Sequence, residues 1–179
     1  MSEVVSELAT RVAIALGSNM QDRYELLQSA ISAMSALDGV TLIASSRIEE
    51  TEPLGPPQPS YLNAMVLVET TSSLPSLLSQ LQVIEAQHGR KRAVTKGPRT
   101  IDLDIVWAGG VTVTTLELLI PHPGLTSRAF WQRELAELLG VDAAAEAIAA
   151  AQVHTGMDTA ESDVAKHEHR WSGSWDTVV

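Results

Sequence analysis

The stretch GPRTIDLDIV, residues 97–106, ends in a β-rich run with two aspartates where a buried strand would carry Val, Ile or Leu. Side chains at alternate positions of a strand point to the same face, and their Cα atoms lie about 6.6 Å apart. Asp102 and Asp104 are therefore expected on one face of a strand. The apolar residues beside and between them are expected on the other face.

Two bare carboxylates at that distance repel by about 2.5 kcal/mol at an effective dielectric constant of about 20. A divalent cation beside them reverses the sign of this energy, and magnesium commonly takes one or two carboxylates together with substrate phosphates. For so short a motif the alternative is that both acids face solvent on a one-sided sheet. The pair indicates a magnesium site when a phosphate site lies next to it.

The segment that leads into this strand is basic. HGRKRAVTKGPR, residues 88–99, holds five of the 12 Lys and Arg residues of the chain and no acid. The formal net charge of −10 argues against a protein that binds a nucleic-acid backbone. A basic loop on an acidic protein indicates a local anion site, with a solvated charged loop as the alternative. Phosphate-holding cations beside magnesium-holding acids are what a nucleoside triphosphate requires.

Hydrophobic periodicity places this strand last in a βαββαβ order. The predicted elements are a strand at 11–16, a helix around 27–34, a β-rich segment at 40–48, a strand at 61–69, a helix around 74–84 and the strand at 101–107. Gly17 to Asn19 and Asp38-Gly39 are expected to be turns. The order predicts an α+β fold with a ferredoxin-like sheet. A β ribbon near 111–120 and helices near 127–139 and 142–152 elaborate it.

Length and composition fit one domain. The 179 residues are 45% hydrophobic and 19% charged, which is typical of a globular protein rather than a disordered one. Residues 1–10 are expected to form an N-terminal extension, 11–152 the domain and 153–179 a polar, mobile tail.

Several classes of protein are not expected from the sequence. The chain has no cysteine, which excludes disulfides and thiolate metal sites. It has no apolar run of the roughly 20 residues that a membrane helix needs, and MSEVVSELAT lacks the basic start of a secretory signal. A cytoplasmic protein without a membrane or nucleic-acid partner is expected.

With these features in view, GPRTIDLDI resembles the signature of the 6-hydroxymethyl-7,8-dihydropterin pyrophosphokinase family. The resemblance covers roughly residues 11–139. Its motifs are ALGSN at 15–19, ETEPLG at 50–55, YLNAMV at 61–66, IEAQHGR at 84–90 and PHPGLTSRAF at 121–130. It implies an enzyme of folate biosynthesis that transfers pyrophosphate from ATP to the pterin hydroxymethyl oxygen and releases AMP. A monomer is expected.

The resemblance also assigns the phosphate side of a site. Asp102 and Asp104 match the carboxylates that hold two magnesium ions in the family. The matches to phosphate-binding positions are Arg90, Arg92, Arg99, His122 and Arg128. Arg90 and Arg99, together with Asp102 and Asp104, are also expected to be catalytic. Gln82 and Glu85 match positions near the base and ribose, with an ordinary solvated helix face as the alternative.

On the pterin side, Tyr61 and Phe130 match the pair of aromatic residues that stack on the ring. Asn63 shares a strand face with Tyr61 and offers both a donor and an acceptor to the pterin edge. The pocket is completed by loop positions matching Thr51, Pro53 and Leu54.

The chain departs from the family pattern just before Gly97. The family usually has Arg-Trp there, and this chain has Thr95-Lys96. Because lysine cannot stack as tryptophan does, weaker closure of the basic loop over substrate is expected.

Two other functions remain open at this point. One is a ferredoxin-like binding or regulatory module that has lost the chemistry, and the other is a different magnesium-dependent nucleotidyl transferase.

Overall fold

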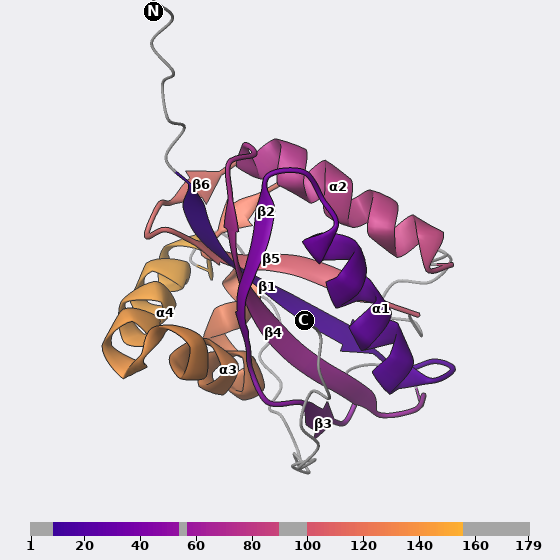
Figure 1. The fold of residues 1–179 in the computed structure, drawn as a ribbon. Coiled ribbons are helices and arrows are strands. Elements are labelled where there is room, and N and C mark those ends of the chain that lie inside the picture. Colours follow the sequence, from indigo (N-terminus) through magenta and orange to yellow (C-terminus); the bar gives the residue numbers. More distant parts are fainter. Residues whose placement is uncertain (1–8, 54–56, 90–99, 156–179) are drawn as a thin grey trace, which may run out of the picture.

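An antiparallel sheet lies at the centre of the computed structural model, which describes residues 9–53, 57–89 and 100–155 (Figure 1). Four strands follow the order β2-β4-β1-β5, and a fifth, β3, pairs with β4. Their bounds are β1 Thr10–Ser18, β2 Val40–Ser45, β3 Glu49–Thr51, β4 Tyr61–Thr70 and β5 Asp102–Ala108. A separate two-stranded ribbon pairs β6 Val113–Thr114 with β7 Leu119–Ile120.

Four α-helices cover the two faces of the sheet. On one face, α1 (Arg23–Ser35) and α2 (Leu74–Gln87) pack against the sheet through the larger of two apolar clusters. On the other face lie a 3₁₀ turn, η1 (Pro123–Thr126), and helices α3 (Ala129–Leu139) and α4 (Val141–Thr155), packed through the second cluster. Figure 1 shows the two helix pairs on opposite sides.

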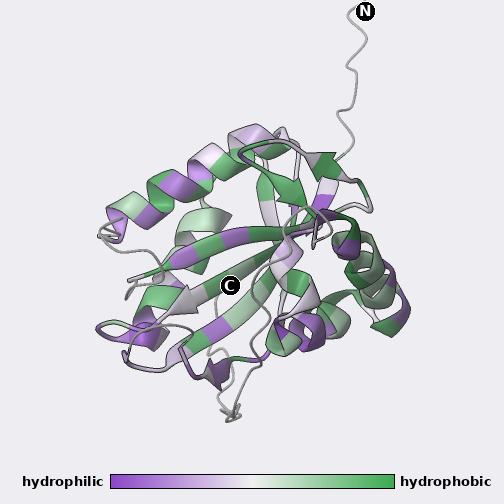
Figure 2. Cartoon of the chain, turned by 180° about the vertical axis from the view of Figure 1, so that it is seen from behind, coloured by the Kyte–Doolittle hydropathy of each residue, from purple (hydrophilic) through white to green (hydrophobic). Residues whose placement is uncertain are grey.

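The central strand β1 is buried on both faces. Val12, Ile14 and Leu16 point into the α1/α2 cluster, whereas Ala13 and Ala15 point into the α3/α4 cluster. A strand covered on both faces reads as a continuous apolar run rather than an alternating one, which explains the sequence RVAIAL. Figure 2 shows this apolar character along the strands.

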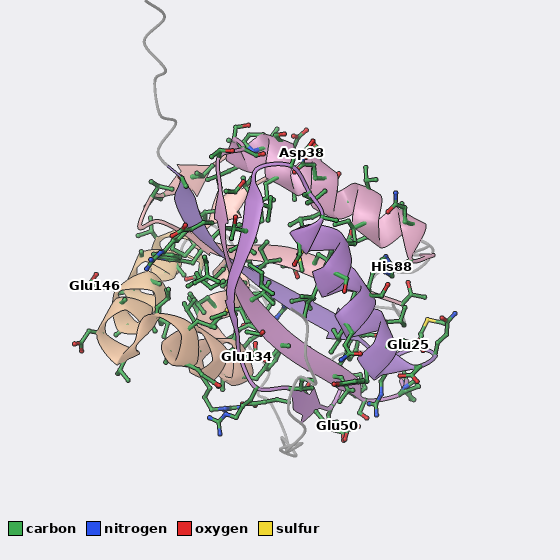
Figure 3. All side chains as sticks on the ribbon, viewed as in Figure 1. Glu25, Asp38, Glu50, His88, Glu134 and Glu146 are labelled. Carbon is green, nitrogen blue, oxygen red and sulfur yellow. The ribbon has the colours of Figure 1, made fainter. Side chains whose placement is uncertain are left out.

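The two helices of the first layer are capped and joined locally. Asp22 accepts a hydrogen bond from the Glu25 N–H at 3.0 Å, which satisfies one of the free donors at the start of α1. At the far end of α2, His88 Nε2 lies 2.9 Å from Ser29 Oγ of α1. Figure 3 labels His88 at this end of α2, where the basic segment of the sequence begins.

Most predicted elements are present, with differences at their ends. The first strand continues through Gly17 and Ser18, since these residues pair with Asn63 and Leu62 of β4. Helix α1 ends at Ser35, before the expected Asp38-Gly39, and Gly39 adopts a positive φ of 73° in the turn that follows. The β-rich segment at 40–48 contains β2, and β3 was not predicted as a strand.

The last helix is longer than predicted. α4 continues past residue 152 to Thr155, and His154 is buried in this last turn. His154 Nε2 lies 3.2 Å from the carbonyl oxygen of Ile120 in β7. The predicted end of this helix at residue 152 is therefore three residues too early, because His154 docks the helix end on β7. No helix among residues 9–53, 57–89 and 100–155 has both the length and the apolar character of a membrane span.

Two ion pairs fasten α3 to the segment around β3. Arg133 contacts the Glu49 carboxylate with Nε at 3.2 Å and Nη2 at 2.5 Å, and the Glu49 side chain is only 6% exposed. Arg47 pairs with Glu137 at 3.1 Å, and both of these side chains are more open to solvent. The first pair therefore connects the helix to the strand that carries Thr51, and it does so with a buried carboxylate.

Replacing Arg133 with methionine is expected to lower the free energy of unfolding by about 2–3 kcal/mol, because the Glu49 charge then stays buried without this partner. Arg47→Met removes the same kind of side chain from an exposed pair and is expected to cost under about 1 kcal/mol. Urea denaturation at pH 7.5 measures both. Equal losses in the two variants would contradict the ranking.

Candidate active site

A pocket of about 160 Å³ opens on the α3 face of the sheet, near the ends of β1 and β4. Its walls come from β1, β3, β4, β5 and the start of α3. Seven of the residues predicted to form a site line it: Thr51, Tyr61, Asn63, Asp102, Asp104, Arg128 and Phe130. The structure therefore brings residues expected on the phosphate and pterin sides into one cavity.

Strand register explains this convergence. Gly17 of β1 pairs with Asn63 of β4 on one side and with Asp102 of β5 on the other. Ala15, two residues earlier, pairs with Asp104. Paired residues share a face of the sheet, so the two acids and the amide lie on either side of β1. The small residues of β1 leave open space between them.

The pterin side is built on β4 and β3. The amide Nδ2 of Asn63 donates a hydrogen bond to Thr51 Oγ1 at 2.8 Å, and both residues are buried. This bond orients the Asn63 amide within the pocket. Tyr61 lies at the start of β4, and Phe130, the only phenylalanine of the chain, stands at the start of α3. These two aromatic side chains line the cavity from different elements.

Two predicted pterin residues are not in this lining. Pro53 is half-buried but does not line the pocket, and Leu54 lies outside the described residues. Glu52, between Thr51 and Pro53, does line the pocket although it was not predicted.

Among the described residues that line the pocket, the phosphate side combines two acids with Arg128. Asp102 and Asp104 are half-buried, whereas Leu103 and Ile105 between and after them are core residues, as the alternation predicted. Arg128 Nη1 lies 3.9 Å from Asp104 Oδ2. The Arg128 guanidinium also lies over the ring of Trp131, with Cζ 4.0 Å from the ring centroid. A cation thus stands beside the acids, on the same pocket wall as Trp131.

Magnesium is the metal that the resemblance implies for these acids. Two carboxylates on one strand face suit an ion that takes one or two carboxylates and completes its shell with phosphate and water. The described residues contain no group of three or more His, Cys, Asp or Glu side chains placed to hold a metal. The two carboxylates of Asp102 and Asp104 match the number that such an ion commonly takes.

His122 is held in one protonation state by its surroundings. Its Nδ1 accepts a hydrogen bond from the Gly124 N–H at 2.9 Å. The backbone N–H of His122 donates to the Val106 carbonyl of β5 at 2.8 Å and holds the residue beside that strand. Burial is the main cause that lowers the pKa of His122 to about 4, with Arg128 and His154 lowering it further and Asp102 opposing them. The ring is therefore neutral at pH 7, with its proton on Nε2.

This lowered pKa predicts a loss of stability in acid. The unfolded chain binds a proton at His122 near pH 6.5, before the folded chain does near 4, so stability falls as the pH drops between these values. The loss from this residue between pH 7 and 4.5 is expected to be about 2 kcal/mol. Urea denaturation of His122→Asn should show a pH dependence weaker by that amount. An unchanged pH dependence in the variant would contradict this account.

Gln82 and Glu85 do not lie in this pocket. Both belong to α2, on the opposite face of the sheet, and they have different surroundings. Gln82 is exposed, whereas Glu85 is 3% exposed and accepts a hydrogen bond from the Leu103 N–H of β5 at 2.8 Å. Glu85 thus holds the strand at the residue between the two acids. A role near the nucleotide base stays a prediction for both.

Three predicted arginines and the Thr95-Lys96 departure lie outside the described residues. Arg90, Arg92 and Arg99 all fall in the range 90–99, between the end of α2 and β5. Their assignment rests on the resemblance alone, and so does the expectation of weaker loop closure.

Besides Glu52, the sequence prediction missed Gly17 and Trp131, which also shape the pocket. Gly17 was expected in a turn, but it lies in β1, and a Cβ placed there would be 3.1 Å from Asn63 Oδ1 and 3.7 Å from Tyr61 Cδ1. Trp131 is 3% exposed and lines the pocket beneath Arg128. The ALGSN motif contained the signal for Gly17. Nothing in the pattern around Trp131 distinguished it from a core residue.

Comparison with known proteins shows the family of the chain. The sequence model of the 7,8-dihydro-6-hydroxymethylpterin-pyrophosphokinase (HPPK) family matches residues 13–140. The chain belongs to the HPPK family. The match spans the sheet and continues through α3, so every described residue that we place in the pocket lies within the HPPK region.

Relatives in the HPPK family include bacterial and fungal proteins. The chain is 39% identical over 129 residues to 2-amino-4-hydroxy-6-hydroxymethyldihydropteridine pyrophosphokinase of Pseudomonas aeruginosa, covering 72% of this chain and 80% of that one. The enzyme of the same name from Haemophilus influenzae is 42% identical over 118 residues, with 65% and 74% covered. The folic acid synthesis protein fol1 of Pneumocystis carinii is 38% identical over 130 residues, 72% of this chain but only 17% of the relative.

Solved structures show the same fold. The crystal structure of Plasmodium falciparum HPPK-DHPS with pterin and p-hydroxybenzoate matches with a TM-score of 0.57 at 15% identity. The match covers 73% of this chain and 40% of the Plasmodium chain. The two proteins therefore share the HPPK fold, a mixed arrangement of helices and antiparallel sheet.

Proposed function

We propose that this HPPK-family protein transfers pyrophosphate from ATP to 6-hydroxymethyl-7,8-dihydropterin, giving the pterin diphosphate and AMP, in folate biosynthesis. One observation carries the proposal. The two acids of β5 and the Asn63 amide of β4 line a single pocket on either side of Gly17. An acceptor ring held at Asn63 would then face a nucleotide held at the acids.

The pterin half of the pocket binds and orients the acceptor. Tyr61 and Phe130 offer apolar ring faces to a flat heteroaromatic ring. Asn63 is oriented by Thr51, and its buried amide supplies directed hydrogen bonds to the ring edge. A buried amide left without partners disfavours other ligands, so this arrangement supports selectivity for a pterin. Pro53 and Leu54 are proposed to border the same site.

The phosphate half holds and neutralises the triphosphate. Asp102 and Asp104 would hold two magnesium ions, which when bound neutralise phosphate charge and lower the pKa of a bound hydroxyl. Arg128 supplies a planar donor fork beside Asp104. His122 offers a neutral Nε2–H donor, and its protonation state does not change near pH 7. Transfers of this type are driven mainly by positioning and charge stabilisation, so no strong general base is required.

Residues outside the described pocket are also proposed to bind the nucleotide. Arg90, Arg92 and Arg99 are proposed to contact the phosphates, with Arg90 and Arg99 catalytic. Gln82 and Glu85 are proposed to lie near the base and ribose. These roles rest on the family resemblance.

We also propose a sheet topology, domain bounds, an oligomeric state and a cellular location for the protein. The strand order β2-β4-β1-β5, with α1 and α2 as the crossover helices between strands, supports a ferredoxin-like sheet. The β6–β7 ribbon, α3 and α4 elaborate this sheet. The catalytic domain is proposed to span residues 11–152 together with the last turn of α4, between an N-terminal extension and a C-terminal tail. The protein is proposed to be a cytoplasmic monomer.

The reaction is tested by following AMP from purified protein with ATP, magnesium and 6-hydroxymethyl-7,8-dihydropterin, with each component omitted in turn. AMP formed only in the complete mixture would support the proposed transfer. Pterin binding without AMP would favour a binding module that has lost the chemistry. Nucleotide turnover without pterin binding would favour another nucleotidyl transferase.

A further inference from the structure

Trp131 contacts His122 and Arg128, the two described residues that are proposed to bind phosphate directly. Its side chain is almost fully buried, at 3% exposure, and it forms part of the pocket wall. The Arg128 guanidinium carbon lies 4.0 Å from the centroid of its ring. The His122 ring meets it edge-on, with centroids 5.1 Å apart and an interplanar angle of 83°. One side chain therefore contacts both His122, the N-cap of η1, and Arg128, the N-cap of α3.

The contact with Arg128 restricts a flexible side chain. The Arg128 side chain is 33% exposed, and its ion pair with Asp104 is long, at 3.9 Å. A contact of that length in a partly exposed position constrains the guanidinium only weakly. A guanidinium stacked on an aromatic face is held in a plane by cation–π attraction, which an aliphatic side chain of similar volume does not provide.

Close packing around Gly124 joins this platform to His122. A Cβ placed on Gly124 would lie 3.0 Å from Trp131 Cζ3, 3.1 Å from His122 Nδ1 and 3.3 Å from Arg128 Nε. The absence of a side chain at Gly124 thus allows all three groups to meet. The Gly124 N–H also fixes the His122 ring by its hydrogen bond to Nδ1. These contacts form one packed unit with Trp131 at its base.

We propose that Trp131 is a positioning residue for nucleotide binding, which holds the Arg128 guanidinium in the plane and place where it meets the triphosphate. The inference rests on the proposed phosphate role of Arg128. Trp131 lowers the entropy that Arg128 loses when phosphate binds, because the guanidinium is already ordered in the free protein. Its contribution to ATP affinity is therefore transmitted through Arg128.

The test measures the affinity of a magnesium complex of an ATP analogue with a methylene group between the α and β phosphates, by titration calorimetry. Trp131→Leu is expected to weaken this binding about tenfold, and Trp131→Phe, which keeps an aromatic face, less than about threefold. Leu135→Ala is the matched control, since Leu135 is fully buried in the same helix and the same apolar cluster but does not line the pocket. It should lower stability without changing analogue affinity.

A double-mutant cycle separates positioning from general packing. In an Arg128→Met background, Trp131→Leu is expected to change analogue affinity less than twofold. A full tenfold effect in that background, or no effect of Trp131→Leu in the otherwise unchanged protein, would overturn the inference while leaving the role of Arg128 intact. If Arg128→Met alone left the affinity unchanged, the proposed phosphate role of Arg128 would fail, and the inference would fail with it.

Discussion

Asp102→Asn is expected to lower the rate of AMP formation by at least about a thousandfold while leaving the fold intact. The substitution keeps the shape of the side chain but removes the negative charge that would hold magnesium beside the triphosphate. Asp102 is half-buried at the pocket, and its strand is anchored by Leu103 and Ile105 in the core, so the loss should not spread to the sheet. AMP assays and urea denaturation of the same preparation measure the two effects.

Asp38→Asn provides the matched control for this variant. Asp38 is exposed in the turn after α1, away from the pocket, and Figure 3 labels it there. The control should retain the activity of the unmodified protein. An Asp102→Asn protein that is folded and turns over at a near-normal rate would show that Asp102 does not hold a required metal ion.

Gly17→Val is expected to weaken pterin binding about a hundredfold. Its Cβ would lie 3.1 Å from Asn63 Oδ1 and 3.7 Å from the Tyr61 ring, and the two methyl groups would extend further into the pocket. Overpacking a fitted site typically costs about 1–3 kcal/mol, and the upper end of this range corresponds to about a hundredfold. Gly17→Ala adds one methyl group and is expected to weaken binding about tenfold.

The loss of affinity in the Gly17 variants should be confined to the pterin. Titration calorimetry with pterin should show the graded loss, whereas affinity for the magnesium–ATP analogue should change only a few-fold. Gly110→Ala serves as a control, since a Cβ there meets nothing within 4 Å and Gly110 does not line the pocket. Because Gly110 has a φ of 75°, this variant should lose some stability but keep its affinity for pterin. Equal pterin affinity in Gly17→Val and the unmodified protein would mean that the ring does not occupy the space above Gly17.

Local pattern was enough to predict most of the elements, because burial on one or both faces leaves a clear periodicity. It failed for β3, where Glu49 and Glu50 do not resemble a strand. That strand exists because it pairs with β4 and because the Glu49 charge is matched by Arg133 of α3. Both partners lie outside the segment itself, so its local sequence pattern does not predict the strand.

The same limit applies to the candidate site. The alternation of β5 was sufficient to put Asp102 and Asp104 on one face, and the structure agrees. Their position opposite Asn63 depends on the register of β5 and β4 on β1, which no single segment encodes. A role for Trp131 was not predicted for a similar reason, since its partner His122 lies outside α3.

Gln82 and Glu85 have different surroundings although their spacing places them on one face of α2. Glu85 lies three residues from Gln82 on the same helix, and such residues commonly share an environment. In the structure Gln82 is exposed, whereas Glu85 is buried against the backbone of β5. The difference arises because the sheet edge at Leu103 supplies a backbone N–H that the carboxylate can accept. A helix pattern alone does not contain this information.

The central claim is that one pocket holds both substrates, with the nucleotide at the acids of β5 and the pterin at β4. A crystal structure with magnesium, the α,β-methylene ATP analogue and 6-hydroxymethyl-7,8-dihydropterin tests it most directly. We expect magnesium bound to Asp102 and Asp104, and the pterin ring between Tyr61 and Phe130 with hydrogen bonds to Asn63. Magnesium held by other side chains, or a pterin bound away from Asn63, would contradict it.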